Sequence, residues 1–252
     1  MSYESDLLGN KMENDFRQVF YKVYNSKFQK DLFYSIEKEI KNEWKYLDYK
    51  IFPLIKNFPK NASILEVGCG RGALLEYLRA KKFVNVLGVD ISKEQIELAK
   101  SKNLNAIESD VLSFLKNSDS KYDIIFAIDI IEHFDKKELI ELFNALYNKL
   151  NENGVVIIQT PNGQAMLPGR IIYGDLTHLT IFTPGSLTQI LRVANFKEFT
   201  FYEKGPVMKN IKGIIRTFLW TFLKFMYNIL LLIECGRTEK ILSQNFICKA
   251  KK

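Results

Sequence analysis

The stretch SILEVGCGRGALLEYL, residues 63–78, decides the fold of this chain. It opens with a short apolar run, continues through Gly68, Gly70 and Gly72, and closes with apolar residues at helical spacing. Glycines at such a junction let the backbone turn tightly and let a ligand approach it closely. The stretch therefore predicts a strand, a glycine-rich turn and a helix, with a ligand seated over the turn.

The alternation of short apolar runs and helical patterns continues after this stretch. It predicts strands at 84–89, 106–108, 122–128 and 154–159, and helices at 72–80, 93–100, 111–115 and 136–150. A helix at 185–194 and strands at 196–203 and 243–250 complete the pattern. We therefore expect an α/β fold, a doubly wound and mostly parallel seven-stranded sheet with helices on both faces. Such sheets bind ligands at the carboxyl ends of their strands.

Three regions are expected along the chain. Residues 1–58 form an N-terminal helical extension that packs on the core, because apolar residues recur at helical spacing from Lys30 to Phe58. Residues 59–203 form the ligand-binding core and include a substrate loop at 161–184. Residues 204–252 form an apolar helical insertion and a closing strand.

Composition sets the class of protein. The 252 residues are 47% hydrophobic and 26% charged, which excludes a disordered, collagen-like or low-complexity chain. Three scattered cysteines suit a reducing compartment, and the polar N-terminus carries no signal-peptide pattern, so the expected location is cytoplasmic. The formal charge of +7 is spread through the chain without a patch of interleaved aromatic and basic residues, so no nucleic acid is expected as a partner.

The glycine turn alone does not identify its ligand, because Gly68, Gly70 and Ala73 also satisfy the GxGxxG/A pattern of dinucleotide sites. Glu66, just before the first glycine, distinguishes the two interpretations. A carboxylate there repels a pyrophosphate but attracts an ammonium or sulfonium group. The charge favours a nucleoside that carries a cation.

With these residues the chain resembles the class I, seven-strand methyltransferases that depend on S-adenosylmethionine (SAM), whose first motif is an acid followed by GxGxG. Further matches follow in order: Asp90 in LGVDIS, Asp110 in AIESDV, then YDIIFAIDIIEHF and LNENGVVIIQTPN. The resemblance is strong over about 62–160, weakens towards residue 196 and is slight beyond it. It implies that SAM is the cofactor and S-adenosylhomocysteine (SAH) the product.

The resemblance also implies roles for single residues. Asp90 would accept hydrogen bonds from both ribose hydroxyls, Asp110 and the backbone of Val111 would hold the adenine, and Glu66 would steady the loop or the amino group. A helix cap is the alternative for Asp110. Cys69 is interpreted as a small residue tolerated in the loop, not as a nucleophile. The expected cofactor-binding residues are Glu66, Gly68, Cys69, Gly70, Gly72, Asp90, Ile91, Asp110, Val111 and Ile128.

The two histidines are the candidate catalytic residues. His178 lies in GDLTHLTIFTPGSL, similar to a substrate-proximal element of small-molecule methyltransferases, and His133 belongs to the EH pair after the expected fourth strand. A neutral histidine can accept a hydroxyl proton, so His178 is the first choice for a base and His133 the second. An acceptor that is already anionic would need no base, and both rings could instead serve loop packing. No metal ion is expected, and Asn162, Arg170, Tyr173 and Asp175 are the candidate substrate contacts.

The segment at 214–233, IIRTFLWTFLKFMYNILLLI, is the most apolar part of the chain. Three interpretations compete: a helix buried against the sheet or in a homodimer, which we favour; a membrane-surface helix within 208–234; and a lid over the substrate. Lys224 near its middle makes a true membrane span costly.

Together these features favour an O-methyltransferase acting on a small or carbohydrate acceptor. The wider resemblance is to bacterial enzymes of capsule and surface-polysaccharide biosynthesis, which methylate sugars, nucleotide-linked intermediates or phosphoramidate groups. Two alternatives stay open. One is a methyltransferase of quinones or lipid precursors at the inner face of the membrane, and the other is a non-catalytic partner protein that binds SAM.

Overall fold

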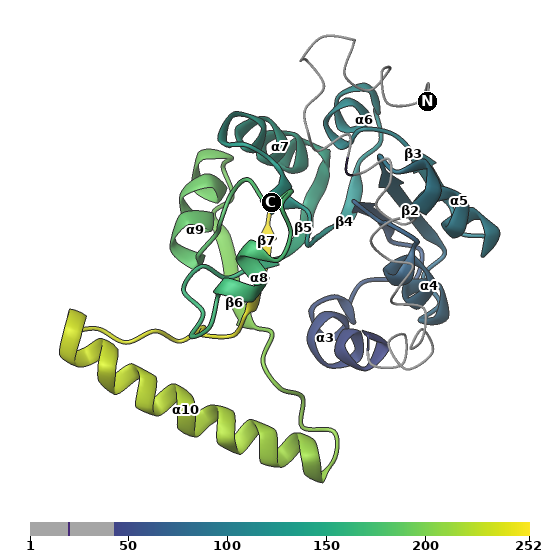
Figure 1. Cartoon of the computed structure of the whole chain (residues 1–252). Coiled ribbons are helices and arrows are strands. Elements are labelled where there is room, and N and C mark those ends of the chain that lie inside the picture. Colours follow the sequence, from purple (N-terminus) through teal and green to yellow (C-terminus); the bar gives the residue numbers. More distant parts are fainter. Residues whose placement is uncertain (1–19, 21–42) are drawn as a thin grey trace, which may run out of the picture.

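The computed structural model describes residue 20 and residues 43–252 (Figure 1). Most of the extension expected over 1–58 therefore lies outside the described residues. Within the described part, residues 43–55 are helical and include a π-helical turn η3 (Leu47–Ile51) and the short helix α3 (Phe52–Ile55). Leu47, Ile51 and Ile55 from this segment are buried, so it packs on the core.

Seven strands form one sheet, in the order β3-β2-β1-β4-β5-β7-β6. The strand pairs from β3 to β5 are parallel, and β7 runs antiparallel to both β5 and β6. The predicted α/β class and the mostly parallel sheet are confirmed. The strands are β1 (Ser63–Val67), β2 (Asn85–Asp90), β3 (Ala106–Glu108), β4 (Tyr122–Ile128), β5 (Leu150–Pro161), β6 (Glu198–Glu203) and β7 (Asn245–Lys251).

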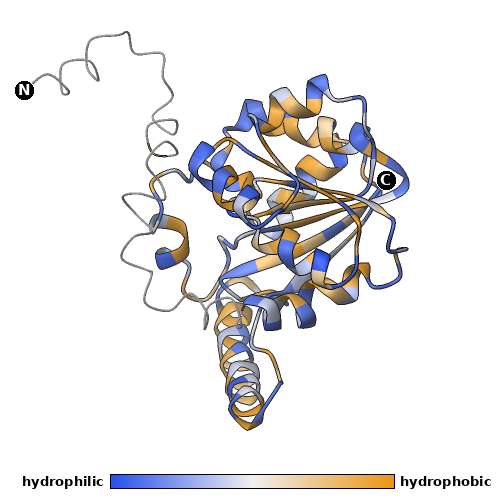
Figure 2. Cartoon of the chain, turned by 90° about the vertical axis from the view of Figure 1, so that its right-hand side faces the viewer, coloured by the Kyte–Doolittle hydropathy of each residue, from blue (hydrophilic) through white to orange (hydrophobic). Residues whose placement is uncertain are grey.

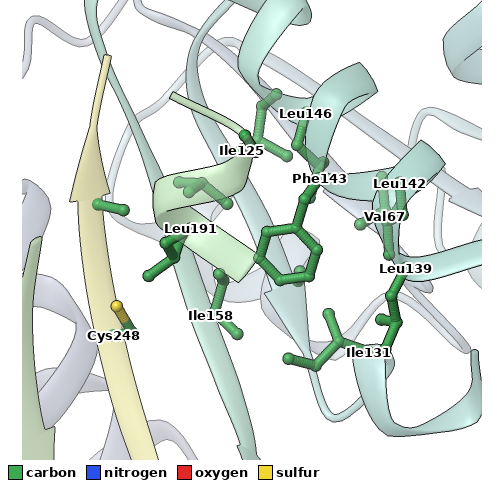
Figure 3. Close-up of a cluster of buried hydrophobic side chains, with 14 of the residues drawn as sticks. Val67, Ile125, Ile131, Leu139, Leu142, Phe143, Leu146, Ile158, Leu191 and Cys248 are labelled. Atoms are coloured by element: carbon green, nitrogen blue, oxygen red, sulfur yellow. The ribbon is translucent and has the colours of Figure 1, made fainter. Parts of the chain in front are cut away.

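Helices cover both faces of this sheet (Figure 1). One face packs against α6, α7 and α9, and Figure 3 shows Phe143 of α7 among the side chains between them and the sheet. The other face packs against η3, α3 and α4, and α5 joins a smaller cluster beside α4. The helices are α4 (Ala73–Ala80), α5 (Lys93–Ser101), α6 (Val111–Asn117), α7 (Lys136–Lys149), α8 (Gly169–Tyr173), α9 (Pro184–Val193) and α10 (Ile211–Cys235), with a 3-10 turn η4 (Ile131–His133).

Local sequence explains where the helices near the site begin. At α7 the carboxylate of Asp135 accepts hydrogen bonds from the backbone of Lys137 and Glu138, while Glu138 caps the Asp135 N–H in return. At α9 Thr183 and Ser186 cap each other in the same way, just before and after Pro184. These caps fix the ends of the loops that carry the two histidines.

Helix α10 is the main departure from the expected packing. Its only buried residue is Gly213, and no part of its apolar window is buried. Figure 2 shows a largely hydrophobic helix that projects from the rest of the domain. Burial against the sheet, one half of the favoured interpretation, is wrong for this chain. Burial in a homodimer, the other half, stays a prediction. Because β6 and β7 are neighbours in the sheet, both ends of the insertion return to one edge of the fold.

Candidate active site

A cavity of about 1260 Å³ lies at the carboxyl ends of β1, β2 and β4, where such sheets bind ligands. Residues 43–47 and residues 204–216 close its other sides. Nine of the ten predicted cofactor-binding residues line it. Gly72 is the exception, and its role is structural. It caps α4 in a left-handed conformation, and a Cβ there would meet the side chain of Leu104 at 2.6 Å.

The glycine turn has the geometry that its sequence predicts. Gly68, Gly70 and Gly72 all have positive φ, of 72°, 49° and 77°. Such backbone conformations are strained for any residue with a Cβ. A Cβ added to Gly70 would have Gln95 Oε1, at 3.9 Å, as its nearest neighbour, so the space over the turn is open. A ligand can therefore lie directly on the backbone there.

Asp90 ends β2 and holds two loops together. Its Oδ2 accepts a hydrogen bond from Gly70 N at 2.8 Å, and its Oδ1 accepts one from Ser92 N at 2.8 Å. Burial raises the pKa of Asp90, while these two backbone donors oppose the rise. Each carboxylate oxygen keeps a second lone pair, so the side chain can still accept the two hydroxyls of a ribose.

Glu66 is a buried carboxyl at the floor of the cavity. It is 4% exposed, and its Oε2 has no hydrogen-bond partner among the described residues. Burial, and then the charges of Asp90 and Glu43, raise the pKa of Glu66 well above its ordinary value. A buried acceptor left unpaired is costly, and a ligand ammonium or N–H group would satisfy it. The residues present therefore fit a cofactor that carries an amino group and a cation.

The adenine end of the predicted site is built from the next loop. Asp110 and Val111 line the cavity, as do Ile91 and Ile128. The Oδ1 of Asp110 also accepts a hydrogen bond from Ser113 N at 2.8 Å, so this residue caps α6 as well. Cys69 lines the cavity, but burial raises the pKa of its thiol, which disfavours a nucleophilic role.

The two histidines lie together, with ring centroids 4.9 Å apart. Glu132 brings them together: its backbone oxygen accepts hydrogen bonds from Leu179 N and Thr180 N, which ties the loop of His178 to η4. Only His133 lines the cavity; His178 lies behind it, with its Nε2 4.0 Å from Glu132 Oε1. Geometry thus reverses the predicted order of the two rings.

Hydrogen bonds fix the tautomer of both rings. Nδ1 of His133 lies 3.2 Å from Thr177 O and 2.9 Å from Thr177 Oγ1, whose own proton goes to Asp175. Nδ1 of His178 lies 3.1 Å from Ile172 O. Because a carbonyl only accepts, Nδ1 carries the proton in each neutral ring and Nε2 the lone pair. Burial, and then the neighbouring His178, lower the pKa of His133, so it is neutral at neutral pH.

Glu132, His133 and His178 also offer three possible metal ligands within 4.8 Å of one another, although no metal ion was expected. Glu132 already accepts a hydrogen bond from Thr160 Oγ1 at 3.0 Å. Burial, and then Asp129, raise the pKa of Glu132, which favours its protonated form and weakens it as a ligand. Chelation is therefore a necessary control for any activity assay.

None of the four candidate substrate contacts lies on the cavity wall. Asn162 is buried, and its amide group bonds to the backbone at Ile241, Ser243 and Gln164, so it holds β5 to the C-terminal segment. Asp175 fixes Thr177 and thereby His133. Arg170 and Tyr173 are exposed on α8.

Asp129 and a set of basic residues line the cavity but were not predicted as site residues from the sequence. Asp129 follows β4 directly, has a φ of 49°, and is held by Gln159 and Asn245. Its place at a strand end was a usable signal. The set of basic residues, the basic wall, consists of four side chains from the segment before and within α10, which carry no motif: Lys204, Lys209, Lys212 and Arg216.

The fold and the site define the class of SAM-dependent methyltransferases with a seven-stranded Rossmann-like sheet. Comparison with known families agrees: residues 40–198 match the family described as "Methyltransferase domain". The chain belongs to this family.

Relatives with assigned names are similar over part of their length. Malonyl-[acyl-carrier protein] O-methyltransferase 1 of Ilyobacter polytropus is 34% identical over 46% of this chain and 44% of its own. Ubiquinone biosynthesis O-methyltransferase of Pelagibacter ubique is 37% identical over 41% of this chain and 43% of its own. The chain thus spans less than half the length of these relatives. A SAM-dependent methyltransferase from Archaeoglobus fulgidus shares the fold, with a TM-score of 0.64 and 23% identity over 92% of this chain and 100% of its own.

Proposed function

We propose that this protein is a SAM-dependent O-methyltransferase of a small-molecule acceptor. The observation that carries the proposal is the buried carboxyl of Glu66, whose Oε2 has no hydrogen-bond partner among the described residues, beneath an open turn of positive-φ glycines. This arrangement suits the amino group and the sulfonium charge of SAM and would repel a pyrophosphate. Asp90 would hold the ribose, and Asp110 with Val111 the adenine. Relatives named as O-methyltransferases support the type of reaction.

His133 is the proposed base. When bound, the cofactor supplies an electrophilic methyl group. His133 lines the cavity and presents Nε2 as its basic nitrogen, so it can take the proton of an acceptor hydroxyl as the oxygen is methylated. His178 is a positioning residue that packs edge to face on His133 and, after burial, contributes to the lowered pKa of that ring.

The basic wall indicates the chemistry of the acceptor. Lys209, Lys212 and Arg216 are exposed side chains that line the cavity, and no ion pair is formed by them in the described part of the chain, although Lys209 helps to lower the pKa of Asp48. Cations so placed suit phosphate or carboxylate groups. We therefore propose a phosphate-bearing acceptor, such as a nucleotide-linked sugar or phosphoramidate intermediate of bacterial capsule or surface-polysaccharide biosynthesis.

Exposure of α10 favours a second candidate acceptor, a lipid precursor with an anionic head group. One experiment separates the two. Purified protein, radiolabelled SAM and a lysate from a strain that lacks the gene are incubated together, with and without a chelator, and the products are fractionated. Label in the glycan or nucleotide-sugar fraction supports the first candidate, and label only in lipid rejects it. No label in any fraction, with SAH binding intact, would instead favour a non-catalytic partner protein.

A further inference from the structure

Helix α10 exposes far more apolar surface than its own domain uses. Along its 25 residues, every large hydrophobic side chain except Trp220, Tyr227 and Leu231 is exposed. Phe218, Phe222 and Phe225 are 71%, 53% and 62% exposed. Contiguous apolar surface of this kind marks an interaction site in a soluble domain.

The orientation of α10 is fixed by hydrogen bonds on its opposite side. The residues that are at least half buried recur at spacings of three or four, from Gly213 through Thr217, Trp220 and Lys224 to Asn228. Asn228 exchanges two hydrogen bonds with the backbone of Glu239, in the segment 236–244 that returns to β7. Because this polar stripe faces its own chain, the apolar arc faces outwards.

Glu203, at the end of β6, anchors the same stripe. Its carboxylate accepts hydrogen bonds from Lys224 Nζ at 2.9 Å and Trp220 Nε1 at 3.2 Å, and from the backbone at Leu242 and Ser243. Burial opposes ionisation of Glu203, but these donors outweigh it and lower its pKa. The anchor holds the helix beside the cavity with its outer face uncovered.

Charge identifies the kind of partner. Residues 204–244 carry seven Lys or Arg and two Glu, a net charge of +5 out of +7 for the whole chain. Lys212 and Arg216 lie at the N-terminal end of α10 and line the cavity as well. An apolar helix face flanked by cations is the pattern of helices that lie in the surface of an anionic bilayer.

The return segment rules out a membrane span. A helix of 25 residues is about 37 Å long, enough to cross a bilayer. The segment 236–244 runs back beside it, however, bonded at Asn228 and Lys224. A crossing would bury this irregular backbone, with Arg237, Glu239 and Lys240, in hydrocarbon that cannot satisfy it. The helix can lie along a membrane but cannot traverse one in this fold.

We propose that α10 docks flat in the head-group region of an anionic membrane, so that the basic wall and the mouth of the cavity meet the lipid surface. Docking itself is independent of the proposed reaction. Its consequence, that the acceptor is an anionic amphiphile taken from the membrane, rests on the second candidate of the proposed function, the lipid precursor.

The test is flotation of the full chain with vesicles, without SAM. One set of vesicles is phosphatidylcholine, and the other contains about one third phosphatidylglycerol. Wild-type protein should float with the anionic vesicles and do so less as salt rises. The triple variant F218S/F222S/F225S should lose binding by roughly tenfold or more, since three apolar side chains leave the bilayer. The variant K209S/K212S/R216S should bind both vesicle types equally weakly.

A matched control removes exposed apolar side chains elsewhere. Leu167 and Leu176 are 77% and 73% exposed in the loop after β5, so L167S/L176S should float like wild type. All variants alter exposed positions, and unchanged thermal melting would show that they fold. Wild-type protein that stays unbound to anionic vesicles, or a phenylalanine variant that floats normally, would overturn the proposal. A stable lipid-free dimer that F218S/F222S/F225S dissolves would assign the face to a second copy instead.

Discussion

The cavity has two walls of opposite charge, built by different parts of the chain. The carboxylate wall, Glu66, Asp90, Asp110 and Asp129, follows the strands of the sheet and also includes the cation Arg71. The basic wall comes from the insertion between β6 and β7. Each carboxyl of the first wall is either buried or hydrogen-bonded, whereas most of the second wall consists of exposed side chains. The difference is what we expect if the first wall is a rigid site for a cationic cofactor and the second, as proposed, an adaptable site for an anionic acceptor.

This contrast also suggests that specificity for the acceptor depends on the basic wall. The carboxylate wall rests on the strand ends of a fold that is shared with methyltransferases of several named substrates. The basic wall belongs to the insertion, where the chain differs from a plain strand connection. We therefore expect changes in one wall to leave ligand binding at the other intact.

The largest expected effect is at His133, which lines the same cavity as the two walls. H133A should lower methyl transfer to the labelled acceptor fraction by about 10²- to 10⁴-fold, because a general base is lost. SAH affinity should not change. Initial rates with radiolabelled SAM and calorimetric titration measure both. H178A should lower the rate of methyl transfer less than H133A, since His178 acts through His133. A greater loss of rate in H178A would identify His178 as the base instead.

The next effect concerns the carboxylate wall alone. D90A should weaken SAH binding by roughly 100-fold, because hydrogen bonds to a charged acceptor contribute about 1.5–3 kcal/mol each. Glu108, an exposed acid at the end of β3, provides the matched control, and E108A should bind SAH normally. Calorimetry with inorganic pyrophosphate should give the same affinity for D90A as for wild type. An equal loss of both ligands would show that the walls are not separate.

The converse change tests the basic wall. K212S/R216S should weaken pyrophosphate binding by about tenfold, a modest effect because both side chains are exposed. SAH binding should stay within the error of the titration. K197S removes an exposed lysine outside the cavity and should affect neither ligand. Pyrophosphate affinity that survives the double variant would remove the case for an anionic acceptor.

The smallest effect is a dependence of SAH affinity on pH. The pKa of Glu66 is raised in the free protein, and a bound ammonium group favours the ionised carboxylate, so binding releases a proton. Affinity should therefore rise with pH, by at most tenfold per unit, until Glu66 is ionised. Titrations should stay below about pH 7, where the ligand's α-amino group keeps its proton. E66Q should bind more weakly at the upper end of this range and lose the pH dependence.

Local sequence predicted the sheet and the cofactor half of the site. The predicted strands at Ser63–Val67, Ala106–Glu108 and Tyr122–Ile128 match β1, β3 and β4 in their bounds. For β1 and β4 the reason is that buried parallel strands need nearly continuous apolar segments. Residues such as Asp90 reach the cavity because every parallel strand ends at the same edge. The SAH titrations of D90A and E66Q test whether these residues bind the cofactor.

The acceptor half could not be predicted because it depends on contacts distant in sequence. His133 lines the cavity and His178 does not, in a loop that Glu132 binds through hydrogen bonds from Leu179 N and Thr180 N. For α10, the apolar composition of the sequence does not distinguish a buried helix from an exposed one. Its exposure follows from hydrogen bonds of Glu203 and Asn228 to a returning segment, which no periodicity reveals.

The most direct test of the central claim, that the carboxylate wall receives a cation-bearing nucleoside, is a calorimetric comparison of two ligands at neutral pH. Wild-type protein is titrated with SAH and, separately, with NADH. The structure predicts saturable SAH binding and NADH binding that is at least about 100-fold weaker, because a pyrophosphate would face Glu66 and Asp90. NADH binding as tight as that of SAH, or tighter, would contradict it.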